Sequence, residues 1–227
     1  KGYFKGNMKV RVREIFASIQ GEGPYIGYKQ LFIRLCSCNL HCKYCDTEFD
    51  IQNSKEYSKE ELLRIVNENL DCHSVSFTGG EPLLSIDFLK EFLPQCKLPV
   101  YLETNGTLYE NLEQVIKYVD YISADIKLSS CTGLNALWDK HEKFFEIASG
   151  KKLFAKMVFD NSITDEEIEK ASLLCNKYNI ELILQPKMNG NIPAVNSAFM
   201  EQTLDKCLAF YKHVRLIPQV HKFIDVQ

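Results

Sequence analysis

The 227-residue sequence predicts an α/β fold, in which parallel strands form a partial, incomplete TIM-like barrel. From residue 31 onward, short apolar runs alternate with amphipathic stretches of helical period. Alternation of this kind favours parallel strands that are joined by right-handed crossover helices. Roughly six or seven such units are too few to close a barrel of eight strands. We therefore expect an open, splayed barrel.

The individual elements follow from period and capping signals. Ser58 precedes a helical pattern and has Glu61 at capping-box spacing, and Thr164 has Glu167 in the same relation. The predicted helices span residues 59–69, 86–93, 110–118, 136–148, 165–178 and 198–212. The predicted strands span residues 31–35, 74–77, 100–103, 121–125, 154–159, 181–184 and 214–217.

Composition and charge describe an ordinary globular chain, with 45% hydrophobic and 25% charged residues. A net charge of -3 excludes a globally basic nucleic-acid-binding protein, although a local basic patch is compatible with it. We find no apolar run of membrane-spanning length and no signal-sequence layout. We therefore expect one cytoplasmic domain over residues 1–227, with no membrane partner. Residues 1–7 are interpreted as remnant tag sequence or a disordered start, because Met8 is a candidate initiator.

Three closely spaced cysteines follow the first predicted strand. Cys38, Cys42 and Cys45 have a C-x3-C-x2-C spacing, and a fourth cysteine at cluster spacing is absent. Three thiolates on a short loop can hold three irons of a [4Fe-4S] cluster and leave the fourth iron open. An open iron suits chelation by the amino and carboxylate groups of S-adenosyl-L-methionine. This spacing therefore indicates a radical enzyme.

Other uses of these thiols are less consistent with the spacing. Structural zinc usually takes paired C-x2-C units or added histidines, and His41 lies inside the loop. Disulfides are disfavoured by nine cysteines, an odd number. Cys36 offers a spare thiol next to Cys38, and we interpret it as a strand residue. The other cysteines are interpreted as small buried apolar groups, namely Cys72, Cys96, Cys131, Cys175 and Cys207.

Polar clusters follow five of the predicted strands. Because ligands of parallel α/β proteins bind at the carboxyl ends of strands, these clusters should converge on one mouth. They are the cysteine loop and residues 78–82, 103–106, 125–127 and 185–186. A non-enzymatic iron-sulfur module would explain the thiols but would leave the other four clusters without a role.

The order of these motifs resembles one enzyme family. The cysteine loop, together with Thr78-Gly79-Gly80-Glu81-Pro82, is similar to the core of radical SAM (S-adenosylmethionine) enzymes. The whole series further resembles the 7-carboxy-7-deazaguanine synthase family, and the head segment 16–24 is its most specific part. The matching segments are residues 16–24, 27, 32–35, 38–40, 45–47, 78–82, 103–106 and 216–222.

The resemblance implies a reaction, cofactors and partners. Members of the family convert 6-carboxy-5,6,7,8-tetrahydropterin to 7-carboxy-7-deazaguanine with loss of ammonia, on the route to queuosine and other deazapurines. It implies a [4Fe-4S] cluster, S-adenosyl-L-methionine and Mg2+, a flavodoxin- or ferredoxin-like electron donor, and a homodimer. A glycyl-radical-enzyme activase is the alternative within radical enzymes, and it would consume the cofactor.

The resemblance also implies roles for particular residues. Cys38, Cys42 and Cys45 would bind the cluster, and Thr47 would bind Mg2+. Residues 8–30 would form an N-terminal substrate-binding extension. The implied cofactor-binding residues are Tyr44, Cys45, Asp46, Gly80, Glu81, Asp125, Ile126, Lys127 and Gln185. The implied substrate-binding residues are Ile19, Gln20, Gly21, Arg34, Thr78, His221 and Gln227.

Several of these roles agree with side-chain chemistry. Arg34 offers a bidentate fork to a carboxylate, and its alternative is a solvated charge at a strand end. Gln20 can pair with the amide-like edge of a pterin through donor and acceptor. The Thr47 hydroxyl suits Mg2+, and its alternative is a helix cap.

The sequence departs from the family pattern at two places. Asp125-Ile126-Lys127 stands where many members have Ser-Pro-Lys, which predicts a carboxylate on the ribose hydroxyls of the cofactor. The alternative is that Asp125 pairs with Lys127 or caps the next segment. Ser37 stands where glycine is usual, and we expect this change to have little consequence.

Overall fold

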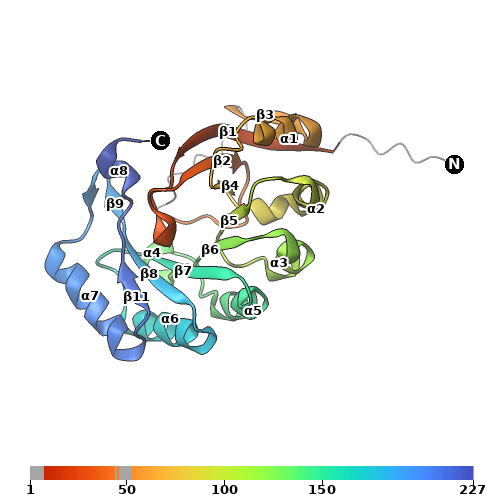
Figure 1. Ribbon diagram of the computed structural model, residues 1–227. Coiled ribbons are helices and arrows are strands. Elements are labelled where there is room, and N and C mark those ends of the chain that lie inside the picture. Colours follow the sequence, from red (N-terminus) through yellow and green to blue (C-terminus); the bar gives the residue numbers. More distant parts are fainter. Residues whose placement is uncertain (1–7, 44, 46–52, 227) are drawn as a thin grey trace.

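The computed structural model describes residues 8–43, 45 and 53–226, which contain a sheet of nine strands in the order β11-β8-β7-β6-β5-β4-β2-β1-β3 (Figure 1). Seven neighbouring strands, from β11 to β2, are parallel, and β1 and β3 extend one edge in antiparallel pairing. The strands are β1 (Lys9–Ile19), β2 (Lys29–Leu35), β3 (Lys55–Ser58), β4 (Ser74–Gly79), β5 (Val100–Thr104), β6 (Tyr121–Asp125), β7 (Lys152–Phe159), β8 (Glu181–Pro186) and β11 (Val214–Leu216). A separate ribbon pairs β9 (Met188–Asn189) with β10 (Ile192–Pro193).

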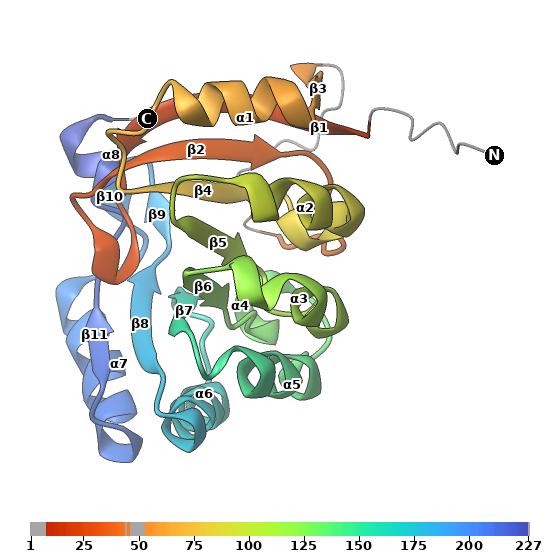
Figure 2. The same ribbon diagram turned by 45° about the vertical axis from the view of Figure 1, so that its right-hand side comes forward.

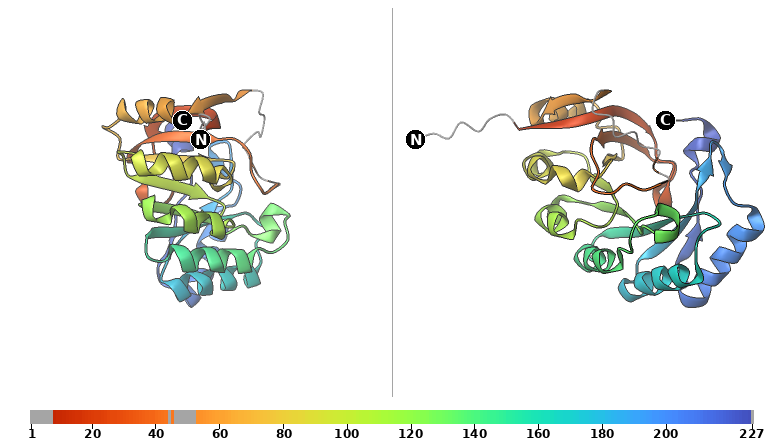
Figure 3. Two further views of the ribbon diagram at one scale, coloured as in Figure 1. Left: turned by 90° about the vertical axis from the view of Figure 1, so that its right-hand side faces the viewer. Right: turned by 180° about the vertical axis from the view of Figure 1, so that it is seen from behind.

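The larger helices lie along the outer side of the curved sheet (Figures 2 and 3). Both predicted capping boxes are present, at Ser58 with Glu61 and at Thr164 with Glu167. Among the described helices, none combines the length and the apolar composition that a membrane crossing requires. The helices are α1 (Lys59–Asn67), α2 (Ile86–Phe92), α3 (Tyr109–Val115), α4 (Ser129–Thr132), α5 (Trp138–Ala148), α6 (Asp165–Tyr178), α7 (Ser197–Phe210) and α8 (His221–Ile224).

The predicted fold class is confirmed. All seven predicted strands and all six predicted helices are present, with ends that differ by a few residues. The strands at the two edges, β11 and β3, are not neighbours, so the barrel stays open. Strand β1 was not predicted. Its first half alternates exposed Lys9 and Arg11 with buried Val10 and Val12, which is the signal that was available for it.

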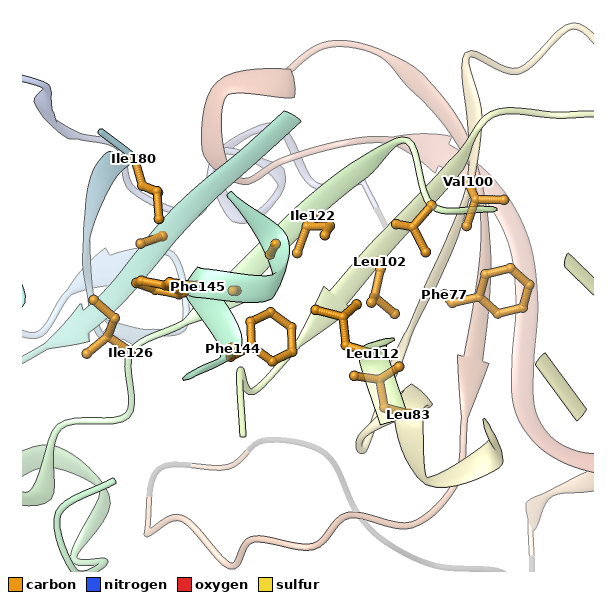
Figure 4. Close-up of a cluster of buried hydrophobic side chains, with 14 of the residues drawn as sticks. Phe77, Leu83, Val100, Leu102, Leu112, Ile122, Ile126, Phe144, Phe145 and Ile180 are labelled. Atoms are coloured by element: carbon orange, nitrogen blue, oxygen red, sulfur yellow. The ribbon is translucent and has the colours of Figure 1, made fainter. Parts of the chain in front are cut away.

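The main hydrophobic core fills the space between the sheet and the outer helices. Leu102 and Ile122, from neighbouring strands, lie beside Leu112 of α3 and Phe144 of α5, and Phe77 of β4 belongs to the same core (Figure 4). All five are almost completely buried. Side chains alternate along a strand, so the strand residues next to these core residues in sequence face the inside of the barrel.

A second, aromatic cluster fills the inside of the barrel at the amino ends of the strands. It is built on Tyr101 of β5, Phe154 of β7 and Ile183 of β8. Tyr25, from a 3-10 turn over Gly23–Tyr25, packs its ring edge-on against Tyr101 and against Tyr121, with centroids 5.7 and 4.8 Å apart. The inside of the barrel is thus filled at this end, and polar residues line it at the other.

Candidate active site

The carboxyl ends of the parallel strands surround a polar cavity of about 250 Å3. Residues from all five predicted strand-end clusters line it, so the prediction that these clusters converge is confirmed. These lining residues are Cys38, Cys42, Cys45, Thr78, Gly79, Gly80, Glu103, Thr104, Asn105, Asp125, Lys127, Gln185 and Pro186.

The glycine turn after β4 lies directly against the cysteine loop. A Cβ atom at Gly79, whose φ is +116°, would stand 2.2 Å from the carbonyl oxygen of Leu35. A Cβ atom at Gly80 would stand 1.8 Å from the carbonyl oxygen of Ser37. Two backbone hydrogen bonds join the segments. Gly80 N–H donates to the carbonyl oxygen of Leu35 (3.1 Å), and Glu81 N–H donates to that of Ser37 (2.8 Å). Glycine is therefore required at both positions to bring the turn and the loop together.

The structure corrects the interpretation of Ser37. Its φ is +71°, in the left-handed region that is unfavourable for residues with a Cβ atom. The family's usual glycine would adopt this conformation without strain. Serine at this position therefore carries a conformational cost that glycine would not. This cost falls on the residue directly before Cys38.

The three predicted cluster ligands share one cavity, and a short helix supports their loop. Lys43 N–H donates to the carbonyl oxygen of Thr132 in α4 (2.9 Å). The next residue, Gly133, has a φ of +74°, and a Cβ atom there would collide with the Lys43 side chain. Cys36 does not appear among the residues that line the cavity.

Positive charge lies near the thiols. Burial raises the pKa of Cys38 and of Cys42, and the ammonium of Lys127 acts in the opposite direction on both. Lys127 lines the same cavity. It therefore offers partial charge compensation to thiolate ligands.

The Glu81 side chain takes its hydrogen-bond partners from the protein itself. Its side chain is completely buried and does not line the cavity. Its oxygens accept hydrogen bonds from Leu83 N–H (3.0 Å), Asn105 N–H (2.7 Å) and the Thr104 hydroxyl (2.9 Å). Burial raises the pKa of Glu81 to about 7, although these bonds oppose the change. The carboxyl group therefore ties the glycine turn to the end of β5, and a contact of Glu81 with the cofactor stays a prediction.

A row of alternating charges crosses the floor of the cavity. Lys127 Nζ lies 2.6 Å from Asp125 Oδ2, Lys156 Nζ lies 3.4 Å from Asp125 Oδ1, and Lys156 also contacts Glu22. Gln219 completes the row by donating to Glu22 Oε1 (2.6 Å). Burial would lower the pKa of Lys156, but Asp125 and Glu22 raise it above its ordinary value. Burial would raise the pKa of Glu22, but Lys156 and Gln219 lower it to about 2.

The predicted cofactor residues have different surroundings. Both oxygens of Asp125 contact lysines, which is the pairing considered as an alternative, and its contact with ribose stays a prediction. The Ile126 side chain is buried in the core, so only its backbone is available to a ligand. Gln185 lines the cavity, is 3% exposed, and its buried Oε1 has no hydrogen-bond partner among the described residues.

Four predicted site residues lie outside the described residues, and their roles stay predictions. They are Tyr44, Asp46, Thr47 and Gln227.

A second cavity of about 150 Å3 adjoins the first and brings together six of the seven predicted substrate residues. They are Ile19, Gln20, Gly21, Arg34, Thr78 and His221. The two cavities share five lining residues, namely Glu22, Arg34, Thr78, Glu103 and Gln219.

Glu103 is the centre of the hydrogen bonds in this second cavity. Gln20 Nε2 and the Ser76 hydroxyl donate to Oε1 (3.0 and 3.3 Å), and the Thr78 hydroxyl donates to Oε2 (2.8 Å). Gln20 Nε2 also donates to Gln30 (3.0 Å), and Gln20 Oε1 accepts from Glu22 N–H (2.9 Å). Both N–H groups of the Gln20 amide are thus engaged within the protein, and its oxygen accepts one bond and keeps a second acceptor site. Gln20 therefore holds Glu103 in place, and its contact with a pterin stays a prediction.

The carboxyl-terminal segment closes one side of the second cavity. Val220 N–H donates to the carbonyl oxygen of Gly21 (2.9 Å). A Cβ atom at Gly21 would stand 2.4 Å from Nδ1 of His221, so glycine is needed for the two segments to meet. Burial lowers the pKa of His221, although the charge of Glu22 opposes this effect. A neutral imidazole is therefore favoured beside the cavity at neutral pH.

Arg34 reaches both cavities from the end of β2. Its Nε donates to Glu14 Oε1 (2.5 Å), and its guanidinium carbon lies 6.0 Å from the centre of the Phe16 ring. These contacts fix the orientation of the guanidinium group.

Sequence reasoning missed four residues of the site, namely Glu22, Lys156, Glu103 and Gln219. Glu22, Glu103 and Gln219 stood in the segments that carried the family resemblance, without assigned roles. Lys156 interrupts an apolar strand, and a lysine in a buried strand indicates a paired charge.

The fold and the cysteine loop define a class of enzyme. The model of the Radical SAM superfamily matches residues 33–175, which is more than half of the chain. The protein is therefore a radical SAM enzyme, a class that uses a [4Fe-4S] cluster and S-adenosylmethionine. The residues that line the cavity suit both groups, since three cysteines are present for an iron-sulfur cluster and Gly80, Lys127 and Gln185 lie around the same space.

Comparison with whole proteins identifies the family. The chain is 37% identical to 7-carboxy-7-deazaguanine synthase of Geobacter sulfurreducens, covering 94% of this chain and 96% of that protein. It is 32% identical to the Archaeoglobus fulgidus enzyme of the same name, covering 97% and 100%. The chain belongs to the 7-carboxy-7-deazaguanine synthase family. The crystal structure of QueE from Escherichia coli, at 21% identity, shares the fold with a TM-score of 0.66 over 96% of this chain and 97% of that one.

These findings bear on the alternatives raised by the sequence. Neither a glycyl-radical-enzyme activase nor a non-enzymatic iron-sulfur module is favoured, because whole-length relatives bear the synthase name.

Proposed function

We propose that this protein converts 6-carboxy-5,6,7,8-tetrahydropterin to 7-carboxy-7-deazaguanine with loss of ammonia. The observation that carries the proposal is the pair of adjoining cavities, one lined by the three cluster cysteines and the other by the predicted substrate residues. Their five shared residues would bring a substrate in the second cavity next to the cofactors in the first.

The charges of the second cavity match the two ends of this substrate. Arg34 would take the substrate carboxylate through its planar fork of donors. Glu103 and Glu22 would accept hydrogen bonds from the donor-rich pyrimidine edge of the pterin. Gln20 and Thr78 hold Glu103 in position by donating to both of its oxygens. A ligand with an anionic end and a donor-rich end would thus meet an oriented partner at each end.

The remaining residues position and shield the reacting groups. When bound, the cluster and S-adenosylmethionine supply the radical chemistry that removes a hydrogen atom from the substrate. Gly21 and His221 bring the carboxyl-terminal segment against the cavity, which limits access of water. Lys156 contacts Glu22, which lines both cavities, and Asp125, which lines the first, and it would hold these two carboxylates between the substrate and the cofactor.

The resemblance to the family supports further parts of this proposal. Residues 8–30 would form the substrate-binding extension, and Thr47 would bind Mg2+ through its hydroxyl group. Gly80, Asp125, Lys127 and Gln185 would contact S-adenosylmethionine. A flavodoxin- or ferredoxin-like protein would supply electrons to a homodimer.

Anaerobic turnover tests the proposal. Cluster-reconstituted protein, S-adenosylmethionine, Mg2+, dithionite and the carboxy-tetrahydropterin should yield the deazaguanine product, detected by mass spectrometry. Glu103→Gln should raise KM about tenfold to hundredfold, because a charged acceptor is worth roughly 1.5 to 3 kcal/mol. Glu113→Gln, an exposed position on α3, serves as the matched control. Absence of product, or equal kinetics for both variants, would contradict the proposal.

A further inference from the structure

A closed ring of hydrogen bonds holds the side-chain amide of Asn105 in one orientation. Asn105 Nδ2 donates to Asn39 Oδ1 (2.8 Å), Asn39 Nδ2 donates to the Thr107 hydroxyl (3.0 Å), and that hydroxyl donates to Asn105 Oδ1 (2.6 Å). Thr107 N–H also donates to Asn105 Oδ1 (3.2 Å). Because the Asn105 oxygen faces two donors, a flipped amide would lose both bonds.

This orientation directs the second N–H of the amide at a cluster ligand. Asn105 Nδ2 lies 3.8 Å from Cys38 Sγ, and Leu40 N–H approaches the same sulfur at 3.4 Å. Asn105 is 5% exposed and Thr107 is 2% exposed, so water competes little with these contacts. Glu81 holds the backbone of Asn105 through its N–H (2.7 Å). The amide is thus a preoriented donor to the first thiol of the loop.

We propose that Asn105 is a positioning residue that makes the cluster easier to reduce. In the one-electron reduction from [4Fe-4S]2+ to [4Fe-4S]1+, a low-potential one-electron reductant supplies the electron, and part of the added charge falls on the ligand sulfurs. An N–H directed at Cys38 Sγ stabilises that charge, and hydrogen bonds to the sulfurs are among the factors that set cluster potentials. The Asn105 amide therefore raises the reduction potential.

The ring explains why Asn105, to which the proposed chemistry assigns no role, has an amide held in one orientation. Asn105 lies in the strand-end cluster at residues 103–106, in which Glu103 faces the second cavity and Thr104 bonds to Glu81. The inference rests on the cluster that the enzyme class uses. It does not rest on the proposed pterin substrate, so an experiment can contradict the role of Asn105 without contradicting the proposed function, and the reverse.

Redox titration of the reconstituted cluster, followed by electron paramagnetic resonance under dithionite without substrate, tests the inference. Asn105→Ala should shift the midpoint potential to a more negative value at wild-type iron content. Asn105→Asp should shift it further, because it places a negative charge beside the thiolate. Thr107→Val should give a smaller shift in the same direction, since it removes one of the two bonds that orient the amide.

Asn111→Ala is the matched control. Its amide donates to the carbonyl oxygen of Leu83 (2.9 Å) in the turn after Glu81, so the variant loses a comparable bond away from the thiols. Its potential should equal that of the wild type. An unchanged or more positive potential in Asn105→Ala at full iron content would overturn the inference. If that variant assembles no cluster, Thr107→Val decides: a negative shift supports the role of Asn105, and an unchanged potential overturns it.

Discussion

Replacing Lys156 with methionine should destabilise the protein, because it removes the shared cation of two largely buried carboxylates. Lys156 contacts Glu22 and lies 3.4 Å from Asp125, and its side chain is 10% exposed. Loss of one partner of a buried ion pair costs about 3 to 5 kcal/mol. Glu22 keeps its bond from Gln219, and Asp125 keeps Lys127. We therefore expect the free energy of unfolding to fall by an amount near the lower end of this range, about 3 kcal/mol.

The size of this loss should depend on pH. In the wild type, the pKa of Glu22 is about 2 and that of Asp125 lies below its ordinary value, although burial acts in the opposite direction on both. Their stabilising contribution is present above the unfolded-state pKa and is lost as pH falls through the folded-state values. In the variant, burial acts on Glu22 without the charge of Lys156 and raises its pKa. The free-energy cost of burying the charged Glu22 carboxylate is present at high pH. It disappears as the carboxyl group takes up a proton. The difference between variant and wild type should therefore be larger at about pH 8 than at about pH 5.5.

Anaerobic urea unfolding, followed by circular dichroism at both pH values, measures this difference. Lys170→Met is the matched control, because Lys170 pairs with Glu166 at 2.6 Å while its side chain is 50% exposed. An exposed pair of this kind should contribute little to the free energy of unfolding, because solvent screens it. Equal losses for the two variants would refute the reasoning. So would a loss in Lys156→Met that is the same at both pH values.

The site supports four further predictions. Alanine at any of the three cavity thiols should abolish iron binding, whereas Cys36→Ala should keep the wild-type iron content and paramagnetic signal; loss of the cluster in Cys36→Ala would overturn the ligand assignment. Ser37→Gly should raise the free energy of unfolding by about 1 kcal/mol, because glycine relieves the left-handed conformation; a thermal transition that does not rise would show that the loop carries no such strain. Asp125→Ala should weaken S-adenosylmethionine binding about tenfold to hundredfold in calorimetric titration and leave pterin binding nearly unchanged; equal losses for both ligands would remove Asp125 from the cofactor site. Gly21→Ala should raise KM for the substrate, since its Cβ atom would displace His221; a wild-type KM would show that the tail does not bear on the cavity.

The fold and the cofactor class could be predicted from the sequence because their signals are local. The periodic spacing of hydrophobic residues identifies each strand and helix within a short stretch of sequence. Ser58 and Thr164 cap their helices through contacts with residues only three positions away. The cysteine spacing is likewise contained in one loop. The rule that parallel strands present their carboxyl ends on one edge then placed the five polar clusters together.

The partners of the charged side chains depended on the tertiary structure. Glu22 meets Lys156, 134 residues away, and Gln219, 197 residues away, and these pairs lie outside any sequence window. Competition among neighbours also decided which predicted groups face the cavity. In the folded chain the Glu81 carboxylate and both N–H groups of Gln20 take partners from the protein itself, which their residue types alone did not indicate. Residue type and spacing limit what a side chain can bind, whereas the three-dimensional arrangement of its neighbours determines which partner it takes.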